Sequence, residues 1–251
     1  MKTDPRGFPG IFAGDFLDFV KVTGQNLTEM IETSHNQVGV HETIVVCRSN
    51  KLANRYNQGI RNTVLKYEEE LRMNDLVMVV KNNYHWLRNL QEVDFIANGD
   101  ILEVLRVRGS RDLYDLRFRD VLVRFTDYRE LEFEAKLMLD TLTMDSPAMD
   151  KERTRVFFAA VSEDYYTVKG KKHKSEAIRE DPFFNALQIK FAYAVTCHKA
   201  QGGQWKHVYI DQGYLTEENL DKEYYRWLYT AITRATEKVF LVNFRPEFYK
   251  E

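Results

Sequence analysis

Between residues 43 and 60, apolar residues follow first a strand-like and then a helix-like spacing. Residues 43–47 (TIVVC) are a short apolar run typical of a buried strand, and Ser49 and Asn50 follow where a helix would begin and be capped. Positions 52, 53, 56 and 60 place apolar or small residues on one side of that helix. A buried strand followed by a capped helix is one α/β unit. A short amphipathic helix is also predicted over residues 26–36.

The pattern changes near residue 74. Residues 76–80 and 101–107 read as strands, and residues 113–125 and 131–139 alternate apolar and polar positions like antiparallel strands. Residues 141–155 fit a surface loop or the start of a helix, and residues 156–161 fit a strand or a helix. We therefore predict a small β-rich insert over residues 74–185. Residues 1–73 and 186–251 would then form one discontinuous α/β domain.

Two stretches near the C-terminus place polar residues beside apolar runs. Phe191 to Val195 is predicted to be one buried strand, and Thr196, His198, Lys199 and Gln201 follow it before the pair Gly202-Gly203, which lets backbone approach a ligand. Open α/β sheets bind ligands at the carboxyl ends of their strands, so this set is expected there. In the second stretch, a helical segment places Arg234 just before a strand over residues 238–242. An arginine held there can fork onto phosphate oxygens.

These stretches resemble motifs V and VI of superfamily 1 DNA helicases of the RecD/Dda and UvrD kind. The matching segments are YAVTCHKAQGGQW at 193–205 and LYTAITRA at 228–235, and residues 44–61 and 74–84 extend the resemblance. It implies an α/β fold with a RecA-like parallel sheet of the P-loop NTPase type. It also implies that the insert is a small barrel like a Src-homology-3 domain. The implied function is the C-terminal motor half of an ATP-dependent 5′→3′ DNA helicase.

The resemblance also implies roles for individual residues. Arg234 would be an arginine finger that meets the γ-phosphate of ATP held by another domain, an effect worth roughly 10³–10⁵ in rate where such fingers are known. The nucleotide-facing set would be Gln201, Gly202, Gln204 and Arg234, although Gln204 stands where UvrD-like members carry a ribose-contacting glutamate. The set that contacts single-stranded DNA would be Thr196, His198, Lys199 and Asn50.

Each of these residues also has a purely structural interpretation. Arg234 could form a surface salt bridge on a helix, His198 could be a hydrogen-bonded core residue, and Asn50 could be a helix cap. Trp205 and Tyr229 are expected to pack. Residues 169–174 (KGKKHK) fit a solvated loop or a phosphate-tracking hairpin. The resemblance leaves open whether Arg48, Lys51 and Asn57 face DNA or nucleotide.

A phosphate loop of the form G-x-x-x-x-G-K-[ST] does not occur in the sequence, and no early apolar strand ends in Asp-Glu. We therefore expect ATP and Mg²⁺ to be held mainly by an N-terminal RecA-like domain of the same protein, and this fragment alone to be inactive. Two alternatives stay open. One is a nucleic-acid-binding module that lost motor activity; the other is the helicase subunit of an exodeoxyribonuclease V-like complex with nuclease subunits.

Composition adds limits rather than a function. Apolar residues make up 44% of the chain and aromatic residues 13%, which indicates a folded protein. The net charge of −2 is uninformative because a nucleic-acid binder needs a local basic track rather than a basic total. Cys47 and Cys197 are too few for a disulfide framework or a zinc site and are expected to be buried thiols. Without an apolar run of membrane-spanning length or a signal peptide, a cytoplasmic location is predicted, with no membrane partner.

Overall fold

The computed structural model describes residues 11–12, 16–88, 93–128, 130–216, 218 and 220–250. It divides the chain into two compact units, Met1–Glu68 with Tyr193–Glu251, and Glu69–Ala192. The second boundary between the units lies after Ala192, whereas the sequence pattern placed the end of the insert at residue 185. The predicted single strand over residues 191–195 is wrong, because this stretch contributes to two different strands. Strand β8 (Leu187–Phe191) pairs inside the second unit, and β9 (Ala194–Thr196) pairs inside the first.

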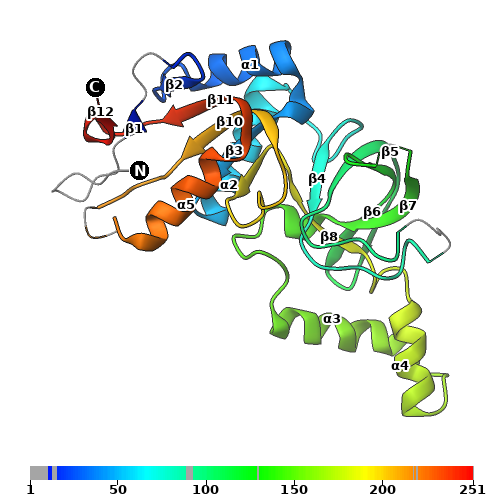
Figure 1. The fold of residues 1–251 in the computed structure, drawn as a ribbon. Coiled ribbons are helices and arrows are strands. Elements are labelled where there is room, and N and C mark those ends of the chain that lie inside the picture. The colour runs from blue at the N-terminus through cyan, green and yellow to red at the C-terminus, as the bar shows by residue number, and fades with distance from the viewer. Residues whose placement is uncertain are drawn as a thin grey trace. The chain divides into compact units, whose positions relative to one another are not determined.

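The first unit is built on a five-stranded parallel sheet (Figure 1). Its strand order is β2 (Phe19–Val22), β11 (Ala235–Val242), β10 (Trp205–Asp211), β3 (Thr43–Cys47) and β9. All four neighbouring pairs are parallel. Every residue of β3 is buried, as expected for a strand covered on both faces. Two short strands, β1 (Ile11–Phe12) and β12 (Tyr249–Lys250), form a separate parallel pair.

Helices cover both faces of this sheet. Side chains alternate along β10, and those of Tyr209 and Asp211 point to the face that carries α1 (Leu27–Val38) and α2 (Asn50–Gly59). Tyr209 donates to the Met30 carbonyl at 2.6 Å, and the Tyr56 hydroxyl donates to Asp211 at 2.5 Å. The opposite face carries α5 (Lys222–Ile232), and the side chain of Tyr224 on this helix is buried. The predicted α/β, RecA-like class is therefore confirmed.

Helix α2 differs in one detail from its predicted start. Ser49 has extended backbone and its hydroxyl accepts a hydrogen bond from the Leu52 amide at 3.2 Å, so Ser49 is the cap. Asn50 is the first residue inside the helix, and its interpretation as a cap is wrong. A π-helical turn, Ile60–Val64, continues α2, and 3₁₀ turns lie at Val40–Glu42 and Pro246–Phe248.

The second unit contains the predicted barrel. Its five strands close in the order β4 (Leu76–Val79), β5 (Ile101–Leu113), β6 (Leu116–Phe125), β7 (Glu132–Met138) and β8. The pair β7–β8 is parallel, and the pairs β4–β5, β5–β6, β6–β7 and β4–β8 are antiparallel. Leu102 and Val104 on β5 are fully buried and Glu103 between them is not. On β6, Val121, Val123 and Phe125 are buried in the alternation that predicted a strand over residues 113–125. A 3₁₀ turn, Leu139–Leu142, follows β7.

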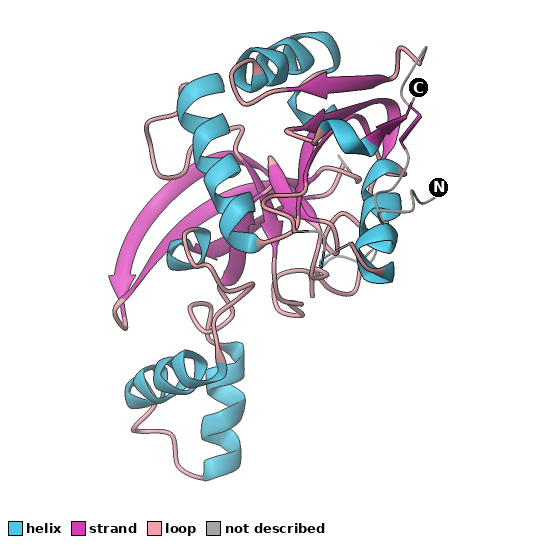
Figure 2. Ribbon diagram, turned by 90° about the vertical axis from the view of Figure 1, so that its left-hand side faces the viewer, coloured by secondary structure: helices cyan, strands magenta, loops and turns pink. Residues whose placement is uncertain are grey.

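The insert is not wholly β-structured. Residues predicted ambiguously form α3 (Lys151–Asp164), whose cap Asp150 accepts a hydrogen bond from the Arg153 amide at 2.8 Å. The basic run 169–174 was predicted to be a loop or a hairpin, but most of it is helical, because α4 (Lys171–Glu180) begins within it. Figure 2 shows these two helices joined by a short loop. Phe157, Val161 and Ile178 of the helices pack against Phe118 and Met138 of the barrel. Local periodicity over these short helices is too weak to show that burial.

Candidate functional site

The loop between β9 and β10, residues 197–204, runs the length of the sheet. Thr196 is in register with Cys47, and Cys47 is in register with Asp211, the last residue of β10. The loop therefore leaves from the carboxyl end of the sheet. It arrives at Trp205, which is in register with Ala235 at the amino end. Along its course the loop contacts α5, since the Cys197 thiol lies 3.5 Å from the Trp227 carbonyl.

The loop begins as a helical turn and ends at the two glycines. The amides of Lys199 and Ala200 both donate to the Thr196 carbonyl, at 2.8 and 3.1 Å. Gly202 has a φ of +90°, a conformation that side chains rarely adopt. Gly203 has another reason to be glycine, because an added Cβ would lie 2.4 Å from the Trp205 ring. Gly203 is thus explained by packing, and Gly202 by the turn, whatever the loop binds.

The four residues predicted to contact DNA lie at the carboxyl ends of the adjacent strands β3 and β9. Thr196 is half-buried at the end of β9, His198 is exposed, and Asn50 is half-buried at the start of α2. Lys199 is half-buried, and burial lowers the pKa of its ammonium group from the usual value. The exposure of His198 contradicts its interpretation as a core residue. This end of the sheet therefore presents a hydroxyl, an imidazole, an amide and an amine.

Arg234 lies at the other end of the loop, between α5 and β11. Its Nε donates to the Thr230 carbonyl at 3.1 Å, Nη1 to the Gly203 carbonyl at 3.2 Å, and Nη2 to the Thr233 hydroxyl at 3.2 Å. All three acceptors are uncharged. Within the described part of the chain Arg234 forms no ion pair, so its interpretation as a surface salt bridge is wrong. A half-buried guanidinium without a carboxylate partner is suited to an anionic ligand.

The remaining predicted nucleotide-facing residues occupy the end of the loop nearest Arg234. Gln201, Gly202 and Gln204 are all exposed. They place two side-chain amides and a glycine backbone at the Arg234 end of the loop. Among the described residues there is no cluster of three or more His, Cys, Asp or Glu side chains that could hold a metal ion.

Arg48 was not assigned a role from sequence. It follows β3, is exposed, and its guanidinium carbon lies 5.6 Å from the Tyr224 ring centre and 5.8 Å from that of Trp227. These rings belong to α5, so Arg48 is a second cation held against this helix. Its position directly after a buried strand, at the carboxyl end of the sheet, was the signal available in the sequence.

Three other predictions concern packing. Trp205 is buried, as expected, and both cysteines are free and buried. Burial raises the pKa of the Cys197 thiol to about 11, and the charge of Arg234 opposes that shift. Tyr229 is 66% exposed, so the expectation that it packs is wrong. It lies on the outer side of α5, where helical spacing from the buried Leu228 turns it to solvent.

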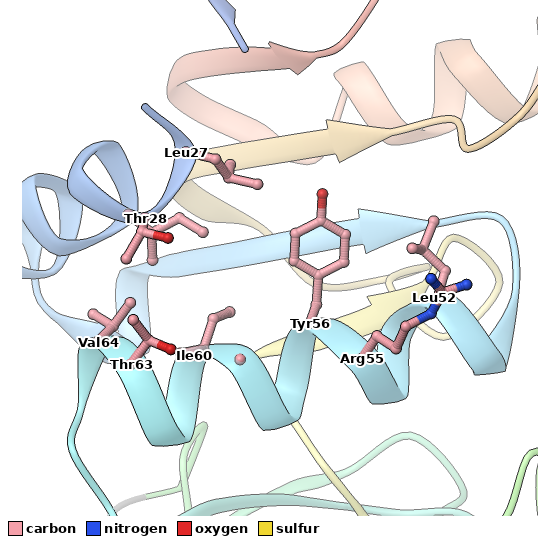
Figure 3. Close-up of a pocket in the computed structure, with 10 residues that line it drawn as sticks. Leu27, Thr28, Leu52, Arg55, Tyr56, Ile60, Thr63 and Val64 are labelled. Atoms are coloured by element: carbon pink, nitrogen blue, oxygen red, sulfur yellow. The ribbon is translucent and has the colours of Figure 1, made fainter. Parts of the chain in front are cut away.

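A pocket of about 280 Å³ lies on the opposite face of the sheet, between α1 and α2 (Figure 3). Its lining is mostly apolar, with Leu27, Ile31 and Ile60 around the Tyr56 ring and Arg55 as a charged group. None of the predicted site residues lines it. The candidate site is therefore the exposed loop and its two ends, and not this pocket.

The comparison with protein families bears on this same loop. Residues 191–242, from the end of β8 to the end of β11, match the family described as UvrD-like helicase C-terminal domain. This segment is therefore similar in sequence to the C-terminal domain of UvrD-like helicases. The match includes the whole loop 197–204, helix α5 and Arg234. No curated protein matches the sequence at a significant level.

Among solved structures, Pif1 helicases are similar at low identity. A structure of two coordinating Pif1 helicases at forked double-stranded DNA shares 12% identity over 84% of this chain, with a TM-score of 0.42. The Bacteroides Pif1 helicase, solved with ADP-AlF3 and single-stranded DNA, shares 13% identity over 83% of this chain, with a TM-score of 0.42. The Candida albicans Pif1 helicase shares 14% identity over 97% of this chain, with a TM-score of 0.35. The chain spans 42% of the length of the first two and 49% of the third. The helicase assignment therefore rests on residues 191–242.

None of the helices in the described part of the chain is long and apolar enough to cross a membrane.

Proposed function

We propose that this chain is the C-terminal motor half of an ATP-dependent DNA helicase, with 5′→3′ polarity of the RecD/Dda kind. The observation that carries the proposal is the setting of Arg234 within a helicase C-terminal domain. Its guanidinium is fixed by three uncharged acceptors and keeps its charge uncompensated by any described carboxylate. The preceding RecA-like domain of the same protein would hold ATP and Mg²⁺ by its phosphate loop.

Arg234 has the donors that an arginine finger needs. A guanidinium carries five N–H groups, and three of those of Arg234 donate to Thr230, Gly203 and Thr233. The other two are left to fork onto oxygens of the γ-phosphate as charge develops there. Bound ATP supplies the phosphoryl group; Arg234 contributes a fixed positive charge. Gln201, Gly202 and Gln204 would line the nucleotide on the same side.

The other end of the loop would contact DNA. Thr196, His198, Lys199 and Asn50 lie at the carboxyl ends of neighbouring strands, where their polar groups can follow a phosphate backbone. The loop joins this end of the sheet to Arg234 in eight residues and packs along α5 between them. A shift of the loop on DNA binding would therefore also move the Gly203 carbonyl, which accepts a hydrogen bond from Arg234. This is the physical link proposed between DNA binding and ATP turnover.

The test is substitution of Arg234 in the protein that joins this chain to its phosphate-loop domain. Arg234→Ala should lower DNA-stimulated ATP turnover by roughly 10³-fold or more while nucleotide affinity changes little. Arg234→Lys should not rescue turnover, because an ammonium lacks the planar fork. Steady-state turnover and equilibrium nucleotide binding are measured on the same preparations.

A matched control is available on the same helix. Arg226 is exposed on α5 and paired with Glu223 at 2.7 Å, so Arg226→Ala should leave turnover close to the parent. Equal losses of turnover and nucleotide affinity in Arg234→Ala would make Arg234 a simple binding or folding residue. Unchanged turnover would place it outside the catalytic cleft.

A further inference from the structure

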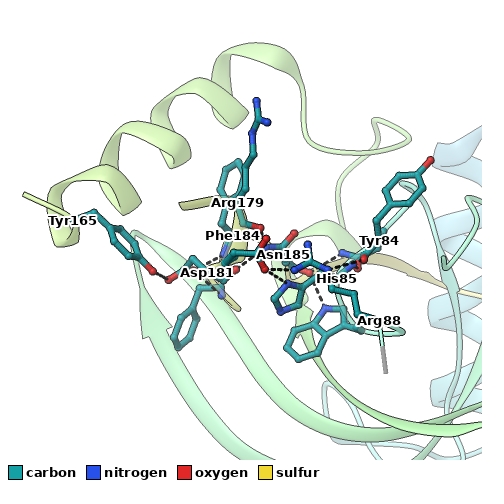
Figure 4. A network of polar contacts seen from close by, with 12 residues as sticks. Tyr84, His85, Arg88, Tyr165, Arg179, Asp181, Phe184 and Asn185 are labelled. Carbon is teal, nitrogen blue, oxygen red and sulfur yellow. Dashed lines mark hydrogen bonds and ion pairs between the residues drawn. The ribbon is translucent and has the colours of Figure 1, made fainter. Parts of the chain in front are cut away.

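The barrel unit contains a polar pocket that the proposed motor function does not use. It measures about 140 Å³ and lies where residues 81–88 meet residues 184–188 (Figure 4). Its lining includes two cationic side chains and four amides, and none of the described residues that line it is acidic. These are Lys81, Arg88, Asn82, Asn83, Asn185 and Gln188. A concave site with several amide groups and a net positive lining is suited to an anionic ligand with hydrogen-bonding edges.

A hydrogen-bond network fixes the shape of this pocket. The Asn185 carbonyl accepts from Asn83 Nδ2 and from Trp86 Nε1, both at 2.8 Å. The Asn185 side chain donates to the carbonyls of Arg179 and Asp181, at 2.7 and 2.8 Å. Figure 4 shows Asp181 and Asn185 linking the end of α4 to the segment around Tyr84 and Arg88. The pocket is therefore preorganised and does not depend on a ligand for its form.

An exposed aromatic ring lies at this pocket. Tyr84 is 59% exposed, and its ring stacks on that of Phe95 with centroids 5.0 Å apart and planes 26° from parallel. Phe95 packs against the Tyr84 ring, and the exposure of Tyr84 leaves part of the ring accessible to a further planar group. Bases of single-stranded nucleic acids stack on such rings.

The polar groups around the ring are only partly occupied. Lys81 is exposed and forms no ion pair with any residue that the structure describes, whereas Arg88 is paired with Glu180. His85 Nδ1 is buried without a hydrogen-bond partner among the described residues, and Glu180 Oε2 is 4.0 Å from it. Burial, followed by the charge of Arg88, lowers the pKa of His85, which favours the neutral form of its ring.

We propose that this pocket binds one nucleotide of single-stranded DNA, with the base stacked on Tyr84 and the phosphate held by Lys81. The inference rests on the proposed function for the identity of the polymer. It adds a contact in the barrel unit, separate from loop 197–204 in the other unit. A proline-rich peptide also binds beside aromatic rings. Lys81, which forms no ion pair with a described residue, and the lack of acidic side chains among the described lining residues favour the anionic strand.

The test uses the whole chain and an oligo-dT that carries a single 2-aminopurine, whose fluorescence is quenched by stacking. Tyr84→Ala should weaken binding by at least about fivefold, the lower range for a base on an aromatic ring, and should reduce the quenching. Tyr84→Phe should restore both. Lys81→Gln should reduce the slope of log affinity against log salt by about 0.7. Tyr128→Ala, an exposed tyrosine of the same unit outside the pocket, is the control.

The loop variant, which is the double substitution His198→Ala/Lys199→Ala in loop 197–204, distinguishes failure of this proposal from failure of the proposed function. If it weakens binding while Tyr84→Ala does not, the pocket proposal is overturned and the DNA role of the loop stands. If Tyr84→Ala weakens binding and quenching while the loop variant does not, the pocket stands and the loop's DNA role is lost. Binding of a proline-rich decapeptide that is abolished by Tyr84→Ala, with oligonucleotide binding unchanged, would assign the pocket to a protein partner instead. Thermal unfolding like that of the parent confirms that each variant is folded.

Discussion

Arg48 and Arg234 both lie against α5, but their surroundings differ. Arg48 stands over two aromatic rings, and Arg234 donates to three uncharged oxygens. Neither forms an ion pair with a described residue, although the chain carries 38 acidic side chains that could have supplied one. At the scale of single residues, an arginine kept away from carboxylates retains its charge for a ligand. This is the feature that distinguishes these two from Arg226 on the same helix.

Lys190 gives a prediction about pH that belongs to one residue. It is 8% exposed on β8, donates to the Met144 carbonyl, and burial lowers its pKa from 10.5 to about 8. Because the folded state releases this proton more readily than the unfolded state, stability should rise as pH increases from 8 toward 10.5. We expect a gain of roughly 1.5 kcal/mol between pH 8 and 9.5 from this group. Urea unfolding across that range measures it.

Lys190→Met should remove most of this rise and should be more stable than the parent at pH 7, where the buried ammonium is fully charged. Lys151→Met, at an exposed position at the start of α3, should keep the rise. The range stops at pH 9.5 because tyrosines with raised pKa, such as Tyr209 at about 12, oppose folding once unfolded tyrosines ionise. The buried thiols of Cys47 and Cys197, whose pKa burial raises, oppose the rise equally in the parent and in both variants, so the Lys190 contribution is the difference between the parent and Lys190→Met profiles. Parallel profiles of these two proteins would show that Lys190 is solvated in solution.

At the scale of elements, Asn57 joins α2 to β9. Its Nδ2 donates to the Ala194 carbonyl at 2.9 Å, and its Oδ1 accepts from the Ala194 amide at 2.8 Å. The side chain therefore pairs with an edge strand as a neighbouring strand would, and it is 3% exposed. The suggestion that Asn57 faces DNA or nucleotide is wrong. β9 is the outer strand of its sheet, so this pairing protects an otherwise open edge.

We therefore predict that Asn57→Ala destabilises the first unit by about 2–4 kcal/mol, since it leaves a buried amide and a buried carbonyl without partners. The free energy of unfolding is measured by urea denaturation, monitored by a spectroscopic signal that arises from the first unit. Asn50→Ala is the matched control, because Asn50 lies after the Ser49 cap on the same helix and should change stability by less than about 0.5 kcal/mol. Equal effects of the two substitutions would contradict the pairing role of Asn57.

At the scale of the whole molecule, the chain leaves the first unit after Glu68 and returns at Tyr193. The first unit has a sheet covered by helices on both faces, and the second has a closed barrel with its own core of side chains such as Phe118. Each unit therefore meets the requirement of a separate hydrophobic core. The Tyr193 carbonyl accepts from the Val45 amide at 3.0 Å, so the returning chain is paired at once within the first sheet.

We predict that replacing residues 69–192 by a Gly/Ser linker leaves the first unit folded. Circular dichroism should retain a mixed helix and strand spectrum, and urea should produce one cooperative transition with a smaller m-value, because less surface is exposed on unfolding. The isolated segment 69–192 should also unfold cooperatively. Loss of a cooperative transition in the linker variant, with the parent intact, would mean that the first sheet requires the barrel unit to fold.

The sequence by itself determined the elements whose periodicity is strong and the motif that carries the chemistry. The apolar run 43–47, the alternation over 113–125 and the Arg234 segment each had a local signal, because strand burial and side-chain direction repeat along the chain. The class of the fold, a parallel α/β sheet interrupted by a barrel, followed from those segments together with the helicase resemblance.

Only the tertiary structure decided which apolar residues share a core and which polar groups face each other. Residues 187–196 are one apolar stretch in sequence, but they supply β8 to the barrel and β9 to the parallel sheet. Asn57 and Ala194 pair across 137 positions, and Arg234 meets Gly203 across 31. Such contacts depend on strand order and loop path, which no short window of sequence contains. The same reason explains why α3 was predicted only as one of two alternatives and α4 was not predicted: their burial against Phe118 and Met138 is a long-range contact.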